Sequence, residues 1–278
     1  MINRYRVSVF GTQLDQLLQS DKRFKDRLVI LNIGYAEPKY NRTIETAGDN
    51  DGGIITRTYR QKASVTVTFG LYVYDVAARY EACEKVKTLC SKGGTITTND
   101  RPGKALYNCV CEQYPEIDSA RDWTAPITMV FSRYDFPYWQ DTTETVKTLT
   151  GTKTETTITV PGNAPKAKCY VEITAQENYP SSINGTTLKV TVDSTYINVN
   201  YPLKKNNFCI IDQDSKNNLR IRIYDNSSSS KKLIASGVGL ATTASSDKLV
   251  AIPGKANKFA ILADKKVKVA LKIRGTWL

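Results

Sequence analysis

The chain of 278 residues is 41% hydrophobic and 24% charged, a composition typical of a folded globular protein, and it is long enough for two domains. It contains no histidine, which excludes Ser-His-Asp and Cys-His catalytic arrangements and the usual histidine-containing zinc sites. No apolar run approaches the roughly 18 residues of a membrane span, and the N-terminal segment lacks the apolar core of a signal peptide. We therefore expect a protein without a membrane span that is made in the cytoplasm.

The beginning of the chain predicts two strands and a loop. Apolar and polar residues alternate in residues 4–10, and residues 28–33 form a short apolar run, so each segment is expected to be a strand. The polar residues 13–26 between them are compatible with a short helix. Residues 48–53, Gly-Asp-Asn-Asp-Gly-Gly, are dense in turn formers and predict a mobile loop.

Residues 59–139 carry the most strongly specified pattern. Five apolar residues at every second position predict a half-buried strand: Val65, Val67, Phe69, Leu71 and Val73. From Asp75 the apolar spacing changes to three and four, which predicts a helix with this aspartate as its N-cap and an exit at Gly93 and Gly94. The predicted buried face of the helix consists of Val76, Tyr80, Cys83, Val86 and Cys90. Strand pattern returns at residues 95–98, 105–112 and 126–131, so we expect a sheet with its single helix packed on it.

The amino-acid composition changes after residue 140, where a threonine-rich segment, residues 141–157, begins. We place the domain boundary there, which gives domains at residues 1–140 and 141–278. The second domain shows strand pattern in residues 169–173, 187–192, 196–201, 208–211, 219–224, 259–262 and 267–273. Short strands without a helix favour an antiparallel β-sandwich.

The net charge of +12 is concentrated in this second domain. Residues 1–140 contain 19 basic and 16 acidic residues, whereas residues 141–278 contain 20 and 11. Four basic residues alternate with apolar ones on the last predicted strand and are our candidate surface-charge contact: Lys266, Lys268, Lys272 and Arg274. No interleaved set of aromatic residues accompanies them, so no nucleic-acid specificity is expected. An anionic cell-wall polymer would be a more natural partner.

No catalytic, cofactor or metal site is predicted. The six cysteines lie among apolar neighbours and are expected to be buried thiols: Cys83, Cys90, Cys109, Cys111, Cys169 and Cys209. Residues 212–216 begin like a calcium loop but lack its glycine, and no phosphate-binding or dinucleotide-binding glycine motif occurs. No carboxylate pair stands out, which disfavours a glycosidase. Tyrosines in the second domain leave a carbohydrate-binding module that contacts host cell-wall glycans as the alternative function.

The order of these features resembles the distal tail protein (Dit) family of siphophages. The likeness rests on the acidic glycine loop before Arg57-Thr58-Tyr59-Arg60, on the strand and helix through residue 89, and on the strand and turn through residues 93–107. It continues through residues 126–139 and, in the second half, through residues 161–163, 209–212 and 267–278. It thus covers nearly the whole chain, and the six cysteines and the basic second domain are departures from it.

The resemblance implies a mainly β protein whose N-terminal β-sandwich, with one α-helix, is related to tail-tube proteins and forms a hexameric ring. The C-terminal domain would be an antiparallel, galectin-like β-sandwich outside the ring. Such a ring is the hub between the tail tube and the host-adhesion device, so the implied partners are the tail tube protein, a tail-associated fibre protein and receptor-binding proteins at the virion tail tip. Our candidates for the ring interface, on the ribbon of residues 59–74 and the loop of residues 41–57, are Arg57, Tyr59, Arg60, Tyr72 and Tyr74.

Overall fold

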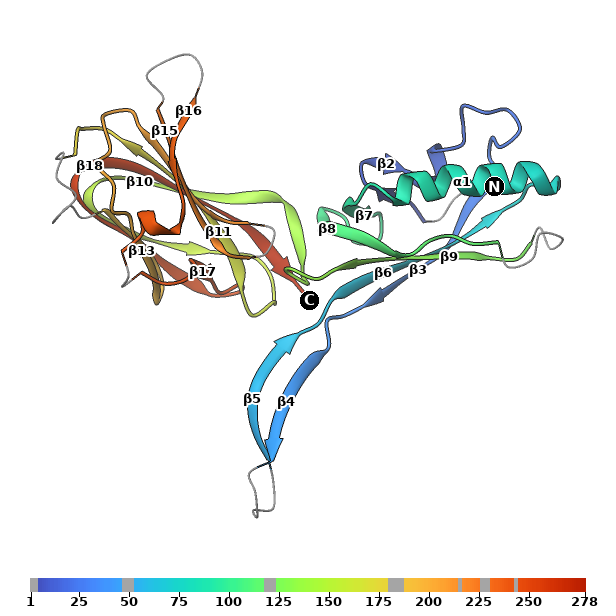
Figure 1. Cartoon of the computed structure of the whole chain (residues 1–278), viewed down its shortest axis with the longest axis horizontal. Coiled ribbons are helices and arrows are strands. Elements are labelled where there is room, and N and C mark those ends of the chain that lie inside the picture. The colour runs from blue at the N-terminus through green and yellow to red at the C-terminus, as the bar shows by residue number, and fades with distance from the viewer. Residues whose placement is uncertain are drawn as a thin grey trace. The chain divides into compact units, whose positions relative to one another are not determined.

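The structure is a computed structural model that describes residues 5–46, 53–117, 124–179, 188–214, 217–225, 231–242 and 245–278. Internal contacts divide the chain into two compact units, Met1–Gln140 together with Leu278, and Asp141–Trp277. Antiparallel strands dominate both units, and the described residues contain one α-helix (Figure 1). The prediction of a mainly β fold with one helix is thereby confirmed. The described helices are too short or too polar to cross a membrane.

The first unit contains two antiparallel sheets that share strand β8. The strands of one sheet are, in order, β2 (Thr12–Gln13), β1 (Val7–Val9), β7 (Gly94–Thr98) and β8 (Lys104–Gln113). The strands of the other are β8, β9 (Ile127–Arg133), β6 (Ala63–Leu71) and β3 (Leu28–Ala36). The register of β8 against β9 shifts between Cys111 and Gln113, an irregularity that locally increases strand twist.

Strand β6 is the centre of the second sheet, because it pairs with β3 along one edge and with β9 along the other. Its apolar residues are buried as the alternation predicts, from Val65 to Leu71. The strand ends at Leu71 and begins at Ala63, so the predicted continuous ribbon of residues 59–74 was too long. A separate strand, β5 (Gly53–Arg60), precedes it.

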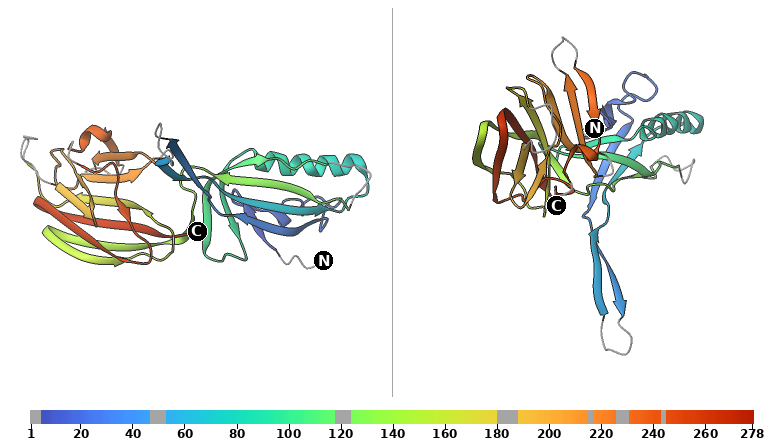
Figure 2. Two further views of the ribbon diagram at one scale, coloured as in Figure 1. Left: turned by 90° about the horizontal axis from the view of Figure 1, so that it is seen from below. Right: turned by 60° about the vertical axis from the view of Figure 1, so that its left-hand side comes forward.

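Helix α1 (Val76–Cys90) begins where the sequence predicts, since the Asp75 carboxylate accepts a hydrogen bond of 2.7 Å from the Ala78 N–H. Figure 2 shows the helix lying along one side of the strands of its unit. Its predicted buried face was partly wrong. Val76 and Tyr80 are exposed, and Arg79 is buried, with its guanidinium donating to the Ala125 carbonyl oxygen at 3.3 Å. The aliphatic part of an arginine can cover apolar surface while its charged end finds an acceptor, which a count of apolar residues does not reveal.

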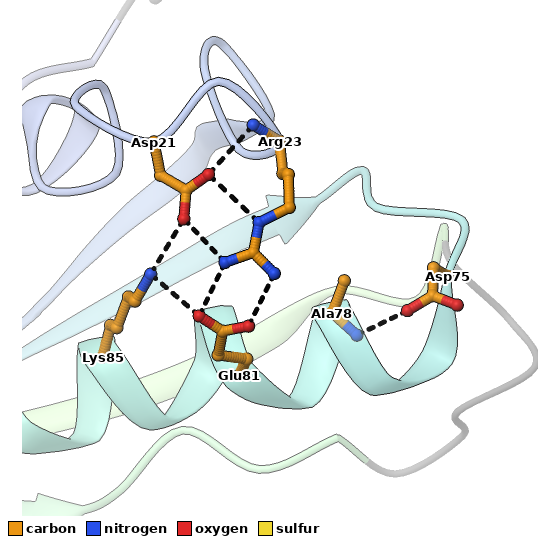
Figure 3. A network of polar contacts seen from close by, with 6 residues as sticks. All are labelled: Asp21, Arg23, Asp75, Ala78, Glu81 and Lys85. Atoms are coloured by element: carbon orange, nitrogen blue, oxygen red, sulfur yellow. Dashed lines mark hydrogen bonds and ion pairs between the residues drawn. The ribbon is translucent and has the colours of Figure 1, made fainter.

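The segment between β2 and β3 is a 3-10 turn, η1 (Leu14–Gln16), followed by further turns. Phe24 is fully buried, and four charged side chains link its segment to α1 (Figure 3). Arg23 donates to Asp21 and Glu81 at 2.8 Å each, and Lys85 bridges the same two carboxylates. Hydrogen bonds from Arg23, followed by one from Lys85, hold the pKa of Asp21 well below its ordinary range, and the same two cations lower the pKa of Glu81.

Acidification is expected to release this network. Both carboxylates ionise more readily in the folded state, so their bonds contribute stability above the unfolded pKa of about 4 and lose it as the pH falls through the lowered folded values. Asp21→Asn should therefore lower the thermal midpoint at pH 7, and the difference from the parent protein should shrink toward pH 3. Glu37→Gln, at an exposed position outside the network, is the control. A difference independent of pH would contradict the assignment.

The second unit is a β-sandwich. Its larger sheet has the strand order β16 (Lys232–Ser236), β15 (Leu219–Asp225), β14 (Phe208–Gln213), β11 (Ala167–Ala175), β18 (Ala256–Trp277) and β10 (Trp139–Thr159). Strands β12 (Leu188–Val192), β13 (Thr195–Asn198) and β17 (Val250–Ala251) and the 3-10 turn η2 (Val238–Leu240) complete the unit. β12 pairs with β18, β13 pairs with β12, and β17 pairs with β11.

Strand β18 organises the core of this unit. It pairs with β12 through residues 259–263 and with β11 through residues 267–273, so the two strands predicted there are one continuous strand. Inward residues of both parts contribute to a single hydrophobic core, including Phe259, Val269 and Leu271. The threonine-rich segment of residues 141–157, in which no strand was predicted, belongs to β10. Of the predicted loop at residues 48–53, residues 48–52 lie outside the described residues and Gly53 begins β5.

Candidate interaction surfaces

The first candidate surface is a β-hairpin of strands β4 (Tyr40–Thr46) and β5. These strands pair only with each other among the described residues, as a separate two-stranded sheet. Figures 1 and 2 show the hairpin projecting from the ends of β3 and β6. The sequence-based expectation of a loop at residues 41–57 was therefore wrong, since most of this segment is ordered strand.

The hairpin exposes apolar side chains that nothing in its own unit covers. Ile44 and Ile55 lie directly opposite each other across the two strands and are 59% and 51% exposed. Tyr40 and Tyr59, nearer the base, are also exposed. A two-stranded hairpin alone is at best marginally stable in water, and exposed strand edges are templates for further pairing. The hairpin therefore has the properties of a surface that another chain covers.

At the base of the hairpin, cations and tyrosines form a shallow groove of about 380 Å³, lined by Tyr59, Arg60, Gln61, Lys62 and Tyr134. The Arg60 guanidinium lies 4.5 Å from the ring centre of Tyr40 and donates to its hydroxyl at 2.9 Å, while the ring centre of Tyr138 is 5.6 Å away. Each such contact is worth about 0.5–1 kcal/mol where exposed. Arg60 thus fixes the first residues of the hairpin against the body of the unit.

Beside Arg60, Lys62 continues into a polar network between strands. Its ammonium is paired with the Glu112 carboxylate, which also accepts a hydrogen bond of 2.7 Å from the Ser132 hydroxyl. The Ser132 and Ser64 hydroxyls are 2.7 Å apart. Desolvation opposes ionisation of Glu112, but the bonds from Lys62 and Ser132 outweigh it and lower the pKa of this carboxyl. The network anchors the beginning of β6 to β8 and β9.

The structure separates the five candidate ring-interface residues into two places. Tyr59 and Arg60 lie at the base of the hairpin, and Arg57 lies on β5 opposite Thr43. Tyr72 and Tyr74 follow the far end of β6, where the Tyr72 ring packs over the backbone of Gly70. A β-carbon on that glycine would lie 2.7 Å from Cζ of Tyr72, so a larger residue at position 70 would have to displace the ring.

Sequence reasoning missed the partners that complete the first of these places, namely Tyr40, Lys62 and Tyr134, and the apolar pair Ile44 and Ile55. A signal was available, because β-branched residues and tyrosines flank the turn-forming run at residues 48–53 on both sides. That arrangement is typical of a hairpin. The ion pair between Lys62 and Glu112 could not be predicted from the sequence, because its two members lie 50 positions apart in the chain.

The second candidate surface is the basic stripe on β18. The apolar residues between its members are buried, so the four basic residues lie on the outer face of the strand. Two of them are neutralised, since Lys272 pairs with Glu172 at 2.7 Å and Arg274 pairs with Glu144 at 3.2 Å. Lys266 and Lys268 are exposed. The stripe is therefore less positive than its sequence indicates.

The remaining charged cluster of the second unit is structural. Arg220 binds the Asp212 carboxylate through two hydrogen bonds of 2.8 and 2.6 Å, and Arg222 donates to it at 2.8 Å. Asp212 therefore joins β14 to β15. In the described ranges, no group of three or more histidine, cysteine, aspartate or glutamate residues could hold a metal ion.

Two β-rich units, the first with one helix and a projecting hairpin, define the fold class. A solved structure with this fold is the Dit (gp 19.1) protein of SPP1, described as a paradigm of the hub adsorption apparatus in Gram-positive infecting phages. The TM-score is 0.64 at 12% sequence identity, and the match covers 99% of both chains. The chain thus has the Dit fold, which confirms the resemblance seen in the sequence at the level of fold.

Two structures of the phage P2 baseplate in its activated conformation, with Ca and with Sr, also match. Their TM-scores are 0.43 and 0.46 at 8% and 9% identity, with 99% of this chain and 98% of those chains covered. No protein-family model and no curated protein sequence matches the chain. Structural similarity at 12% sequence identity defines the fold of the chain. The function is therefore stated below as a proposal.

Proposed function

We propose that the chain is a structural protein of a phage tail tip, where it forms a hub between the tail tube and the host-adhesion device. The observation that carries this proposal is the likeness to the SPP1 Dit protein over 99% of both chains. In this role the chain contacts tail tube, tail-associated fibre and receptor-binding proteins, and it performs no catalysis. Its place is the virion tail tip, after synthesis in the host cytoplasm.

The proposal includes assembly into a homo-hexameric ring through the first unit, residues 1–140, with the second unit, residues 141–278, as a galectin-like sandwich. A cyclic interface joins two different surfaces of each subunit, and it closes when the rotation between neighbours is right. The hairpin supports this arrangement, because burial of the exposed Ile44 and Ile55 side chains by a neighbouring copy would stabilise the assembly. The groove at its base supplies Tyr59, Arg60 and Tyr134, and tyrosine and arginine are enriched at protein interfaces.

Light scattering of the purified full-length chain tests the ring. We expect a mass about six times the 31.0 kDa of one chain, since a closed ring has a fixed number of subunits. A monomer that persists at high concentration would contradict assembly of the chain by itself. Antibody labelling of virions tests the location independently: label at the tail tip supports the hub, and label confined to the capsid overturns it.

A further inference from the structure

Two cysteines meet beneath the last turn of α1. Cys90 is 1% exposed, and its Sγ lies 3.7 Å from Sδ of Met129 on β9. Cys111 lies on β8 directly opposite Phe131 of β9. Phe131 and Met129 are two positions apart on one strand, so their side chains point to the same face. Cys111 therefore projects toward the face on which Cys90 is packed.

The two thiols differ in accessibility and acidity. Cys111 is partly exposed, whereas Cys90 is buried. The influence of each thiol on the other lowers the pKa of Cys111 and raises that of Cys90, and burial raises the pKa of Cys90 further. An accessible thiol of lowered pKa reacts first with an oxidant, and a buried neighbour then resolves the product.

The other four cysteines are buried, unlike Cys111, whose thiol also donates to a carbonyl oxygen, that of Gln113, at 3.2 Å. Cys83 donates to the Pro115 carbonyl oxygen at 3.5 Å, and Cys109 donates to that of Leu106 at 3.2 Å. Burial raises the pKa of Cys109 to about 12 and does the same for Cys209. Cys169 is also buried in the core of the second unit. These four sites are those of inert structural thiols.

We propose that Cys90 and Cys111 form a disulfide when the folded protein meets a small-molecule disulfide such as oxidised glutathione, and that this bond ties the end of α1 to β8. The Cys111 thiolate attacks one sulfur of the oxidant, which forms a mixed disulfide and releases one glutathione thiolate. Cys90 then attacks Sγ of Cys111 while its proton passes to the departing glutathione sulfur, which releases the second glutathione as a thiol. The protein loses two electrons and two protons, and the oxidant gains them.

This bond would remain open in a reducing cytoplasm and close outside it. Closure replaces the packing contact between Cys90 and the sheet with a covalent one, so the last turn of α1 could no longer separate from β8. The reaction depends on the two thiols and on the oxidant, and not on assembly into a ring. Its failure would therefore leave the proposed function standing.

The test is to incubate the native full-length protein with oxidised glutathione, unfold it in urea with iodoacetamide so that the remaining thiols are blocked, and digest it without reduction. We expect a cross-linked peptide pair containing Cys90 and Cys111, and blocking at the other four cysteines. Cys111→Ser should prevent the cross-link, and Cys109→Ser, a buried cysteine on the same strand, should leave it unchanged. In the parent protein, a stable glutathione adduct at Cys111, or no oxidation there, would overturn the proposal.

Discussion

Replacement of Arg133 by methionine is expected to destabilise the first unit by about 3–5 kcal/mol, because it removes one partner of a buried ion pair. Arg133 is 2% exposed, and its Nε lies 3.0 Å from the Asp135 carboxylate. Its Nη1 also donates to the Gln140 side chain at 3.0 Å and to the Tyr138 carbonyl oxygen at 3.3 Å. Methionine fills a similar volume, but it takes a donor away from each of these three acceptors.

Urea unfolding and hydrogen exchange would measure this effect. The unfolding midpoint should fall. Amides of β9, the strand that ends at Arg133, should exchange faster than in the parent protein, whereas amides of β18 in the second unit should keep their rates. Arg27→Met, at an exposed position of the same unit, is the matched control and should change stability by less than about 0.5 kcal/mol. Equal midpoints for the two variants would show that the Arg133 bonds contribute little.

Local patterns were sufficient to predict β6 and the start of α1. The alternation from Val65 to Leu71 reflects a strand with one face in the core, and the Asp75 cap needs only residues within one turn. The buried face of α1 was harder to predict. Arg79 can be buried there because its guanidinium donates to the Ala125 carbonyl oxygen, which belongs to a distant part of the chain. Such acceptors are supplied by tertiary structure, and a periodicity search cannot detect them.

The hairpin and strand β10 were missed for a different reason. Neither element buries a continuous apolar face, because Ile44 and Ile55 are exposed and the middle of β10 is exposed at most positions. Their strand conformation comes from β-branched residues and cross-strand pairing, which give a weaker sequence signal than burial. The proximity of Cys90 to Cys111 depends on the register of β8 against β9, and that of Arg60 to Tyr40 depends on the register of β4 against β5. The sequence alone does not determine either register.

Substitution of the hairpin pair with charges, Ile44→Lys together with Ile55→Glu, is expected to convert the proposed hexamer to monomers. These residues lie directly opposite each other and are exposed within one chain, so the lysine and glutamate can pair across the strands and the hairpin is retained. At an interface both charges would have to be desolvated. A loss of about 3 kcal/mol per contact weakens association more than 100-fold, and every contact of a ring is affected.

Light scattering over a range of concentrations, with circular dichroism as a check on folding, would measure this change. Ile44→Val with Ile55→Val keeps apolar, β-branched side chains and should still assemble. Val110→Asp places a charge at an exposed apolar position of β8, outside the hairpin, and tests whether a new surface charge alone prevents assembly. If the Lys–Glu variant assembles like the valine variant, the subunit contact lies elsewhere, and Tyr72 and Tyr74 at the far end of β6 become the next positions to substitute.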